Sequence, residues 1–310
     1  MEFDESLLTV EERIGFSLRA LYRDYGYALY RMSKFEEYDL YARNKDFLIT
    51  DNVITFNDAG GRLMALKPDV TLSIVRATRD RTDGGVQKLC YNEHVYRAPH
   101  PGGSFQELTQ VGLECIGSLG DREVAETLML ALLSLERVAC GRDYTLNVSH
   151  LGVLSAFLDS LGLSGERRQT ALELVARRSG HELDSLCREC GADRSAAQAL
   201  QHLLRLPPDP AGALEVLRAL CPPAGAASVA GLARVIEGLG DRVRLDFSIV
   251  SDMHYYNGVV FKGYLNGVPA AVLSGGQYDQ LMRKLGHSAR AIGFAVYVER
   301  LERVSGEERL

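Results

Sequence analysis

The chain has 310 residues, of which 46% are hydrophobic and 25% are charged, and its formal net charge at pH 7 is −6. This composition is typical of a globular protein with a sizeable core, built as one large domain or as one domain with an insertion. A negative net charge disfavours nucleic acid as the main partner, because phosphate backbones attract basic surfaces. No apolar run approaches the roughly 20 residues that span a bilayer, and the acidic start lacks the apolar core of a secretory signal. We therefore expect a cytoplasmic protein that binds neither nucleic acid nor membrane.

The first predicted element is a helix that follows Thr9. Thr9 and Glu12 have the spacing of a capping box, and Gly26 ends the apolar stripe. Further strands are expected at 27–31, 53–56 and 62–66, the last two flanking a turn at 58–61, and a helix is expected from Pro68 to about Ala77. Asp69 would lie in the first turn of that helix, where a carboxylate is favourable.

Residues 87–117 predict a long hairpin. Its strands, at 87–97 and 105–117, are separated by a loop rich in proline and glycine that breaks both of them. Side chains alternate along a strand, so one face of the second strand carries Leu108, Gln110, Gly112, Glu114 and Ile116. Burying this amide and carboxylate costs several kcal/mol unless something pairs with them.

Two interpretations of this polar stripe remain open. Gln110 and Glu114 can face solvent or join a satisfied internal network. Alternatively, they can bind a small ligand that carries cations or N–H donors, with Arg97 supplying a positive charge to the same region.

The second half of the chain changes character at residues 164–240. Before this segment we expect a helix from Asp121 to Gly141, a strand at 144–148 and a short helix ending before Gly162. Residues 164–240 are rich in Ala, Leu and Arg, contain two Pro-Pro breaks, and predict an insertion of about four helices. The paired arginines 167–168 and 177–178 within it are expected on a solvated helical face.

Strands are expected to resume after the insertion. Their ranges are 244–250, 256–265 and 268–273, with Asn266-Gly267 as a type I′ turn between the last two. Ser274-Gly275-Gly276 predicts a sharp turn into a helix, and a strand near 291–294 precedes a terminal helix through residues 299–301. Strands joined by tight turns imply an α+β fold with a mostly antiparallel sheet flanked by helices. We expect residues 1–163 and 241–310 to form the core domain, with 164–240 as a helical insertion.

Common catalytic and metal-binding signatures do not occur in the sequence. It contains no GxGxxG, Walker A, GxSxG or HExxH motif. Among its six cysteines only Cys187 and Cys190 form a CxxC pair, and no second pair completes a zinc site. Free thiols are expected, and no metal or cofactor.

Five segments in register resemble histidyl-tRNA synthetase, a class II aminoacyl-tRNA synthetase. The segments, with the family motifs that they resemble, are 66–71 (LRPEGT), 95–97 with 110–114 (motif 2 and the next strand), 255–258 (YYTG), 275–279 (GGRYD), and 292–295 with 299–301 (motif 3). Together they cover the chain from about residue 7 to residue 303. The resemblance implies the class II synthetase fold, and it implies that Asp69, Thr71, Arg97, Gln110, Glu114, Tyr255 and Tyr256 bind histidine.

Several residues depart from the synthetase pattern. The glutamate that follows the motif 2 arginine is replaced within Ala98-Pro99-His100, and two loop arginines are replaced by Ser104 and Gln106. The catalytic arginine of RGLDYY is Ser251, the arginine of GGRYD is Gln277, and the motif 1 proline is Ser33. The chain also ends soon after motif 3, where the family carries an anticodon-binding domain. Loss of one preorganised donor typically costs about 10²–10³ in rate, so we expect no adenylation and assign no catalytic residue.

The retained amino-acid pocket and the lost cations resemble the regulatory subunit of ATP phosphoribosyltransferase. This resemblance implies pairing with the short-form catalytic subunit in the first step of histidine biosynthesis, activation of that subunit, and a part in feedback inhibition by L-histidine. It also implies a homodimer, formed through about residues 28–40, within a hetero-oligomer. Two alternatives are a divergent ligase that activates an amino acid, and a non-catalytic synthetase paralogue with another partner.

Overall fold

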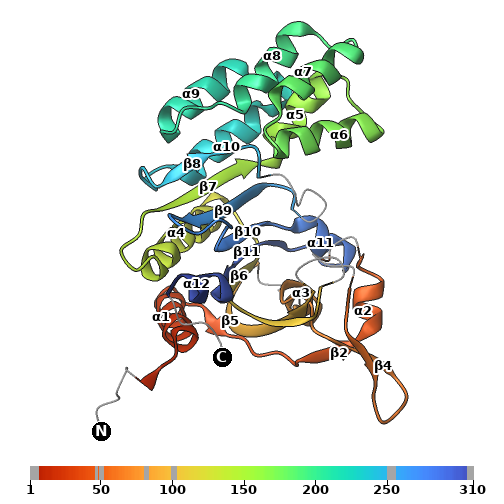
Figure 1. The fold of residues 1–310 in the computed structure, drawn as a ribbon, viewed down its shortest axis with the longest axis vertical. Coiled ribbons are helices and arrows are strands. Elements are labelled where there is room, and N and C mark those ends of the chain that lie inside the picture. The colour runs from red at the N-terminus through yellow and green to blue at the C-terminus, as the bar shows by residue number, and fades with distance from the viewer. Residues whose placement is uncertain are drawn as a thin grey trace.

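The centre of the molecule is an eight-stranded sheet with the strand order β1-β5-β6-β11-β10-β9-β7-β8 (Figure 1). The structure is a computed structural model, and it describes residues 7–45, 48, 52–79, 84–98, 103–249 and 256–305. The strands are β1 (Ala28–Leu29), β5 (Val86–Arg97), β6 (Gln106–Gly117), β7 (Tyr144–His150), β8 (Val243–Leu245), β9 (Val259–Leu265), β10 (Leu273–Gln277) and β11 (Arg290–Tyr297). Only the β1–β5 and β7–β8 pairs in this sheet are parallel, which confirms the predicted α+β, mostly antiparallel fold.

The long hairpin formed by β5 and β6 is confirmed. The two strands pair antiparallel along their full length, from Arg97 opposite Gln106 to Val86 opposite Gly117. The predicted polar stripe lies on one face of β6, and both Gln110 and Glu114 are buried.

Each face of the sheet has its own apolar core. One face packs against α1 (Val10–Asp24), α4 (Asp121–Val138) and α12 (Val298–Ser305). The other face packs against α3 (Thr71–Ala77) and α11 (Asp279–Lys284), and it carries the polar stripe of β6. The capping box of α1 forms as expected, because Glu12 N–H donates to Thr9 Oγ1 and Thr9 N–H donates to Glu12 Oε2. Within the described ranges, no helix combines the length and apolarity needed to cross a bilayer.

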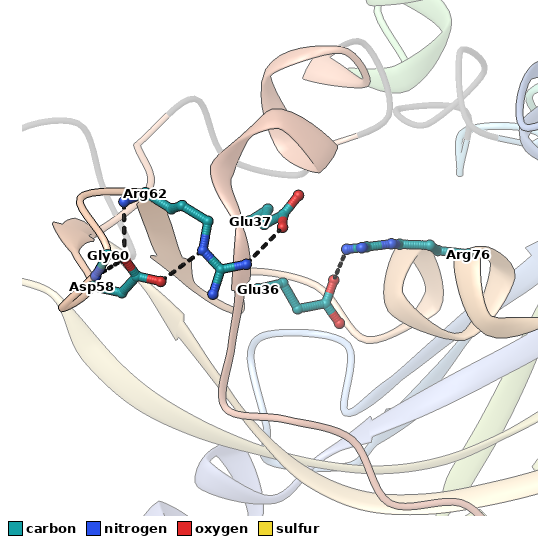
Figure 2. A network of polar contacts seen from close by, with 6 residues as sticks. All are labelled: Glu36, Glu37, Asp58, Gly60, Arg62 and Arg76. Atoms are coloured by element: carbon teal, nitrogen blue, oxygen red, sulfur yellow. Dashed lines mark hydrogen bonds and ion pairs between the residues drawn. The ribbon is translucent and has the colours of Figure 1, made fainter.

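A second, three-stranded sheet lies beside α3. Its strands are β2 (Phe35–Glu37), β4 (Leu63–Leu66) and β3 (Thr55–Asn57), and α2 (Tyr38–Ala42) follows β2. Figure 2 shows Arg62 placed between the turn residue Asp58, 2.8 Å from its Nε, and Glu37, 3.5 Å from its Nη1. Arg76 on α3 pairs with Glu36 at 3.4 Å, so ion pairs on β2 connect the small sheet to its own turn and to α3.

The segment 164–240 contains more helices than the sequence predicted. After α5 (Leu151–Ser160), which precedes it, the described residues form five α-helices instead of about four: α6 (Gly165–Ala176), α7 (Gly180–Glu189), α8 (Arg194–Leu203), α9 (Pro210–Leu220) and α10 (Ala226–Ile236). Figure 1 shows α6 to α9 gathered at one end of the molecule, beyond β8. The prediction of a helical face is wrong for Arg178, which lies in the turn after α6 and has its Nη2 2.7 Å from Asp246 Oδ2, just after β8. The boundaries of this segment as a separate insertion stay a prediction.

The expected turn at Ser274-Gly275-Gly276 is wrong. These residues form the middle of β10, which pairs with both β9 and β11. The glycines are needed because rings cross the strand there. A Cβ at Gly275 would lie 2.6 Å from Phe261 Cζ, and one at Gly276 would lie 2.7 Å from Tyr256 Cδ1. Two glycines in a strand therefore mark close approach of other side chains, not a turn.

Two smaller boundary predictions also differ from the structure. The expected strand at 268–273 does not form as such, since β10 begins only at Leu273, and β8 is confined to Val243–Leu245. The helix expected from Pro68 begins at Thr71, and Asp69 precedes it.

Candidate functional site

Glu114 lies at the centre of the polar stripe, with 1% of its surface exposed. Thr71 Oγ1 donates a hydrogen bond to Glu114 Oε1 at 2.8 Å, and the Tyr278 hydroxyl donates to Oε2 at 2.5 Å. Thr71 is the first residue of α3 and Tyr278 immediately precedes α11. Both carboxylate oxygens therefore accept hydrogen bonds from hydroxyls at the starts of the two helices that cover this face.

A glycine on the neighbouring strand makes room for the Glu114 side chain, and a glycine on its own strand makes room for a ring. Gly293 on β11 lies directly opposite Glu114, and a Cβ there would stand 1.8 Å from Glu114 Oε2. Gly112, two residues before Glu114, lies under the Tyr91 ring, whose hydroxyl oxygen is 2.5 Å from where a Cβ would be. The Glu114 carboxylate therefore lies over Gly293, where a side chain would collide with it.

Burial raises the pKa of Glu114 to about 8. Removal from water is the largest cause, and the negative charge of Asp69 adds to it, while the hydrogen bonds from Tyr278 and Thr71 act in the opposite direction. The protonated, neutral form of Glu114 is therefore favoured below about pH 8.

Asp69 and Arg97 form a second buried pair next to Glu114. Asp69 Oδ1 accepts from the Leu72 N–H at 2.8 Å, which caps the start of α3, and Arg97 Nη2 is 3.5 Å from Asp69 Oδ2. Arg97 Nε also donates to the Pro68 carbonyl at 2.5 Å. Burial raises the pKa of Asp69, although the Arg97 guanidinium opposes this shift.

The structure thus brings Asp69, Thr71, Arg97 and Glu114 together through direct contacts. Gln110 lies on the same strand face as Glu114, four residues earlier, and it is also buried. Tyr256 packs its ring over Gly276 on the same side of the sheet. Tyr255 lies outside the described residues, as does Ser251.

Sequence reasoning missed Tyr278 as a member of this site. Its signal is present in the segment Gly275-Gly276-Gln277-Tyr278-Asp279, which resembles GGRYD and keeps the tyrosine of that motif. The next residue, Asp279, fixes the position of Tyr278. Its Oδ1 accepts from the Ala291 N–H at 3.0 Å, and its own N–H donates to Asn257 Oδ1 at 2.8 Å.

A buried lysine was also missed. Lys67 is fully buried, and its Nζ lies 2.7 Å from Glu93 Oε2. Removal from water lowers the pKa of Lys67, while Glu93 opposes that shift. Glu93 stands opposite Gln110 in the hairpin, so this ion pair borders the polar stripe at its outer end.

Arg300, which lies in the segment 299–301 that resembles motif 3, is held by its own neighbours. Its guanidinium lies 4.2 Å from the centre of the Tyr297 ring, and its Nη1 donates to the Ala271 carbonyl. Tyr297 pairs with Gln110 across β11 and β6. These contacts support a structural role for Arg300.

The arrangement suits a small zwitterion with an additional N–H donor. Two carboxylates and a hydroxyl can accept from an ammonium group and a ring N–H, while Arg97 can pair with a carboxylate. The two carboxyl groups and the Arg97 guanidinium are buried, so charge pairs formed with them would be strong.

A family model described as Histidyl-tRNA synthetase matches residues 3–301. A protein from Caldanaerobacter subterraneus named ATP phosphoribosyltransferase regulatory subunit is 28% identical over 303 residues, which cover 94% of this chain and 77% of the relative. A protein of the same name from Desulfitobacterium hafniense is 32% identical over 253 residues, covering 79% and 65%.

Solved structures of the same families have a similar fold. A Bacillus halodurans structure, described as an ATP phosphoribosyltransferase regulatory subunit/histidyl-tRNA synthetase, has a TM-score of 0.83 and 25% identity, covering 98% of this chain and 81% of that one. A Histidine--tRNA ligase subunit from Alicyclobacillus acidocaldarius has a TM-score of 0.74 and 28% identity, covering 99% and 96%. A chain of the ATP phosphoribosyl transferase (HisG:HisZ) complex from Thermotoga maritima, at 17% identity and a TM-score of 0.71 over 93% and 97%, shares the fold. The predicted resemblance is therefore confirmed, and the chain belongs to the histidyl-tRNA synthetase family, within which it is similar to proteins named ATP phosphoribosyltransferase regulatory subunit.

Proposed function

We propose that this chain is a regulatory subunit of ATP phosphoribosyltransferase, acting in the cytoplasm on the first step of histidine biosynthesis. The observation that supports the proposal most is the difference between two sets of groups at one site. The buried groups suited to a free amino acid are present, whereas the cations suited to a nucleotide are replaced or engaged elsewhere. The name shared by relatives that align with most of the chain supports the same function.

The replaced cations argue against a synthetase reaction. Adenylation builds negative charge on phosphorus in its transition state, and preorganised donors must stabilise that charge. Ser251 and Gln277 stand where the family has arginines, and Arg300 donates to the Ala271 carbonyl. We therefore assign no catalytic residue and no cofactor to this chain.

The retained groups would bind L-histidine in a defined orientation. Asp69 and Thr71 would accept from the α-ammonium group, and Arg97 would pair with the α-carboxylate. Glu114 and Gln110 would meet the imidazole, with Tyr256 and Tyr255 as the neighbouring aromatic wall. The hydrogen bond from Thr71 to Glu114 supports this division, because it connects the ammonium end of the pocket to the imidazole end.

The partner in this proposal is the short-form catalytic subunit, which the chain would activate as a homodimer within a hetero-oligomer. The experiment combines the purified chain with the catalytic subunit from the same organism and measures turnover with and without L-histidine. We expect turnover to rise on mixing and to become sensitive to histidine. Unchanged turnover in a complex that co-elutes on gel filtration would contradict the proposal.

A divergent ligase is the second candidate, favoured by the similarity to a structure described as a Histidine--tRNA ligase subunit. It predicts histidine-dependent exchange of pyrophosphate into ATP by the isolated chain. Our proposal predicts no such exchange. Detecting it would transfer the assignment to the ligase.

A further inference from the structure

A separate cavity of about 300 Å³ opens at the end of the β5–β6 hairpin. It lies on the same face of the sheet as Glu114 but beyond Ile116, the next residue on that face, whose buried side chain lines the cavity wall. Alternate residues of a strand are about 6.8 Å apart. The cavity is therefore adjacent to the proposed histidine pocket and distinct from it.

Positive charge and hydroxyl groups dominate the described lining. Arg79 and Arg290 contribute two guanidinium groups, and the hydroxyl-bearing or amide residues are Thr78, Gln87, Ser118 and Ser288. The lining residues within the described ranges include no aspartate or glutamate. Such a lining favours an anion with several acceptor oxygens.

Glycine brings the hairpin backbone close to this cavity. Gly117 has a φ of +145°, and a Cβ there would lie 2.5 Å from the Gly85 carbonyl oxygen. Both residues line the cavity. A side chain at Gly117 would therefore push against the backbone of residue 85 at the cavity wall.

Arg290 is held in place before any ligand arrives. Its Nη1 donates to the Leu119 carbonyl at 2.8 Å and its Nε lies 3.2 Å from Asp279 Oδ2. A guanidinium that is already ordered loses little conformational entropy on binding. Arg79, two residues after the end of α3, is exposed and also lines the cavity.

We propose that this cavity binds a small phosphorylated molecule through its phosphoryl group. Two guanidinium groups flanked by hydroxyls match the several oxygens and the charge of a phosphate better than they match a single carboxylate. The volume is at the lower end of the range for small-molecule sites, which limits the ligand to one or two phosphoryl groups with a small organic part. This inference does not depend on histidine binding or on the proposed catalytic partner.

The test is calorimetric titration of the full chain with inorganic pyrophosphate, in buffer without phosphate or histidine. We expect saturable binding that falls about tenfold or more in Arg79→Gln, because one charged hydrogen-bond donor is lost. Arg194→Gln on α8 is the matched control. It removes the same charge from an exposed arginine outside the cavity and should bind like the wild type.

A second variant removes space instead of charge. Ala289→Leu should fill part of the cavity and weaken pyrophosphate binding while thermal unfolding shows a folded protein. Malonate, titrated in parallel, should bind more weakly than pyrophosphate if the site selects phosphoryl groups. The proposal is overturned if the wild type does not bind pyrophosphate, if Arg79→Gln binds it equally well, or if malonate binds as tightly.

Discussion

At the scale of single residues, we expect Glu114 to contribute most to histidine binding in the proposed pocket. Glu114→Gln keeps the size of the side chain but removes its ability to become a charged acceptor. Loss of a charged hydrogen bond costs roughly 1.5–3 kcal/mol, so we expect the histidine dissociation constant to rise by about tenfold or more in calorimetry. Glu107→Gln, on the same strand but on the opposite face and exposed, is the matched control. An unchanged constant in Glu114→Gln would place the histidine site elsewhere.

The raised pKa of Glu114 also predicts how stability depends on pH. The ordinary pKa of a glutamate is 4.5, and that of Glu114 is about 8 in the folded chain. Between these values the folded state holds a proton that the unfolded state has released, so raising the pH favours unfolding. We expect the free energy of unfolding of the wild type, relative to Glu114→Gln, to fall as the pH rises from about 5 to about 8. Urea unfolding of both proteins across this pH range measures the difference. If the free energy of unfolding depends on pH in the same way in both, the raised pKa of Glu114 is contradicted.

Gly293 tests whether a glycine under Glu114 is required. A Cβ at Gly293 would meet Glu114 Oε2 at 1.8 Å and the Leu113 carbonyl oxygen at 2.5 Å. Overpacking of this kind typically costs about 1–3 kcal/mol, so Gly293→Ala should lower the free energy of unfolding by that amount. In Gly231→Ala on α10 the nearest atom would be 3.8 Å away, and alanine favours a helix. This control should be neutral or stabilising, and equal losses in both variants would argue against a specific role for Gly293.

At the scale of secondary-structure elements, local signals in the sequence identified the hairpin but not the path of β10. Period-two alternation and a loop rich in proline and glycine are local signals, and they located β5 and β6 within one residue. The role of Gly275 depends on Phe261 and Phe294, which are brought to it only by the folded sheet. Local turn propensity therefore suggested the wrong structure, because a glycine pair has the same local signature in a turn and under a packed ring.

Some residues of the candidate site could be identified from local sequence patterns, and others could not. Gln110, Glu114 and Arg97 could be found from the alternation along the two strands of the hairpin, since all three residues lie in this one local unit. Tyr278 could not be found from pattern alone, because its contact with Glu114 joins positions 164 residues apart. Asp69 and Thr71 came from the resemblance to a family, and only the structure shows how the start of α3 directs them toward the hairpin.

At the scale of the whole molecule, the two proposed sites are connected through Arg290 and Asp279. Arg290 lines the cavity and pairs with Asp279. Asp279 in turn is bonded to Asn257, next to Tyr256, and follows Tyr278, which donates to Glu114. A phosphoryl group bound to Arg290 would weaken its ion pair with Asp279, while the hydrogen bond to the Leu119 carbonyl still holds the guanidinium in place. The weaker ion pair would in turn loosen the contacts of Asp279 that position the tyrosines of the proposed histidine site.

This connection predicts negative coupling between histidine and pyrophosphate. Saturating pyrophosphate should raise the histidine dissociation constant, and histidine should raise that of pyrophosphate by the same factor, because coupling free energies are reciprocal. Typical couplings of 1–3 kcal/mol correspond to roughly 5–150-fold. At a pyrophosphate concentration that just saturates the wild type, Arg79→Gln should show a smaller effect of pyrophosphate on histidine binding. Histidine binding without pyrophosphate should stay unchanged, because Thr71 and Tyr278, not Arg79, contact Glu114. Equal histidine affinity with and without bound pyrophosphate would show two independent sites and would exclude Arg290 as the connection between them.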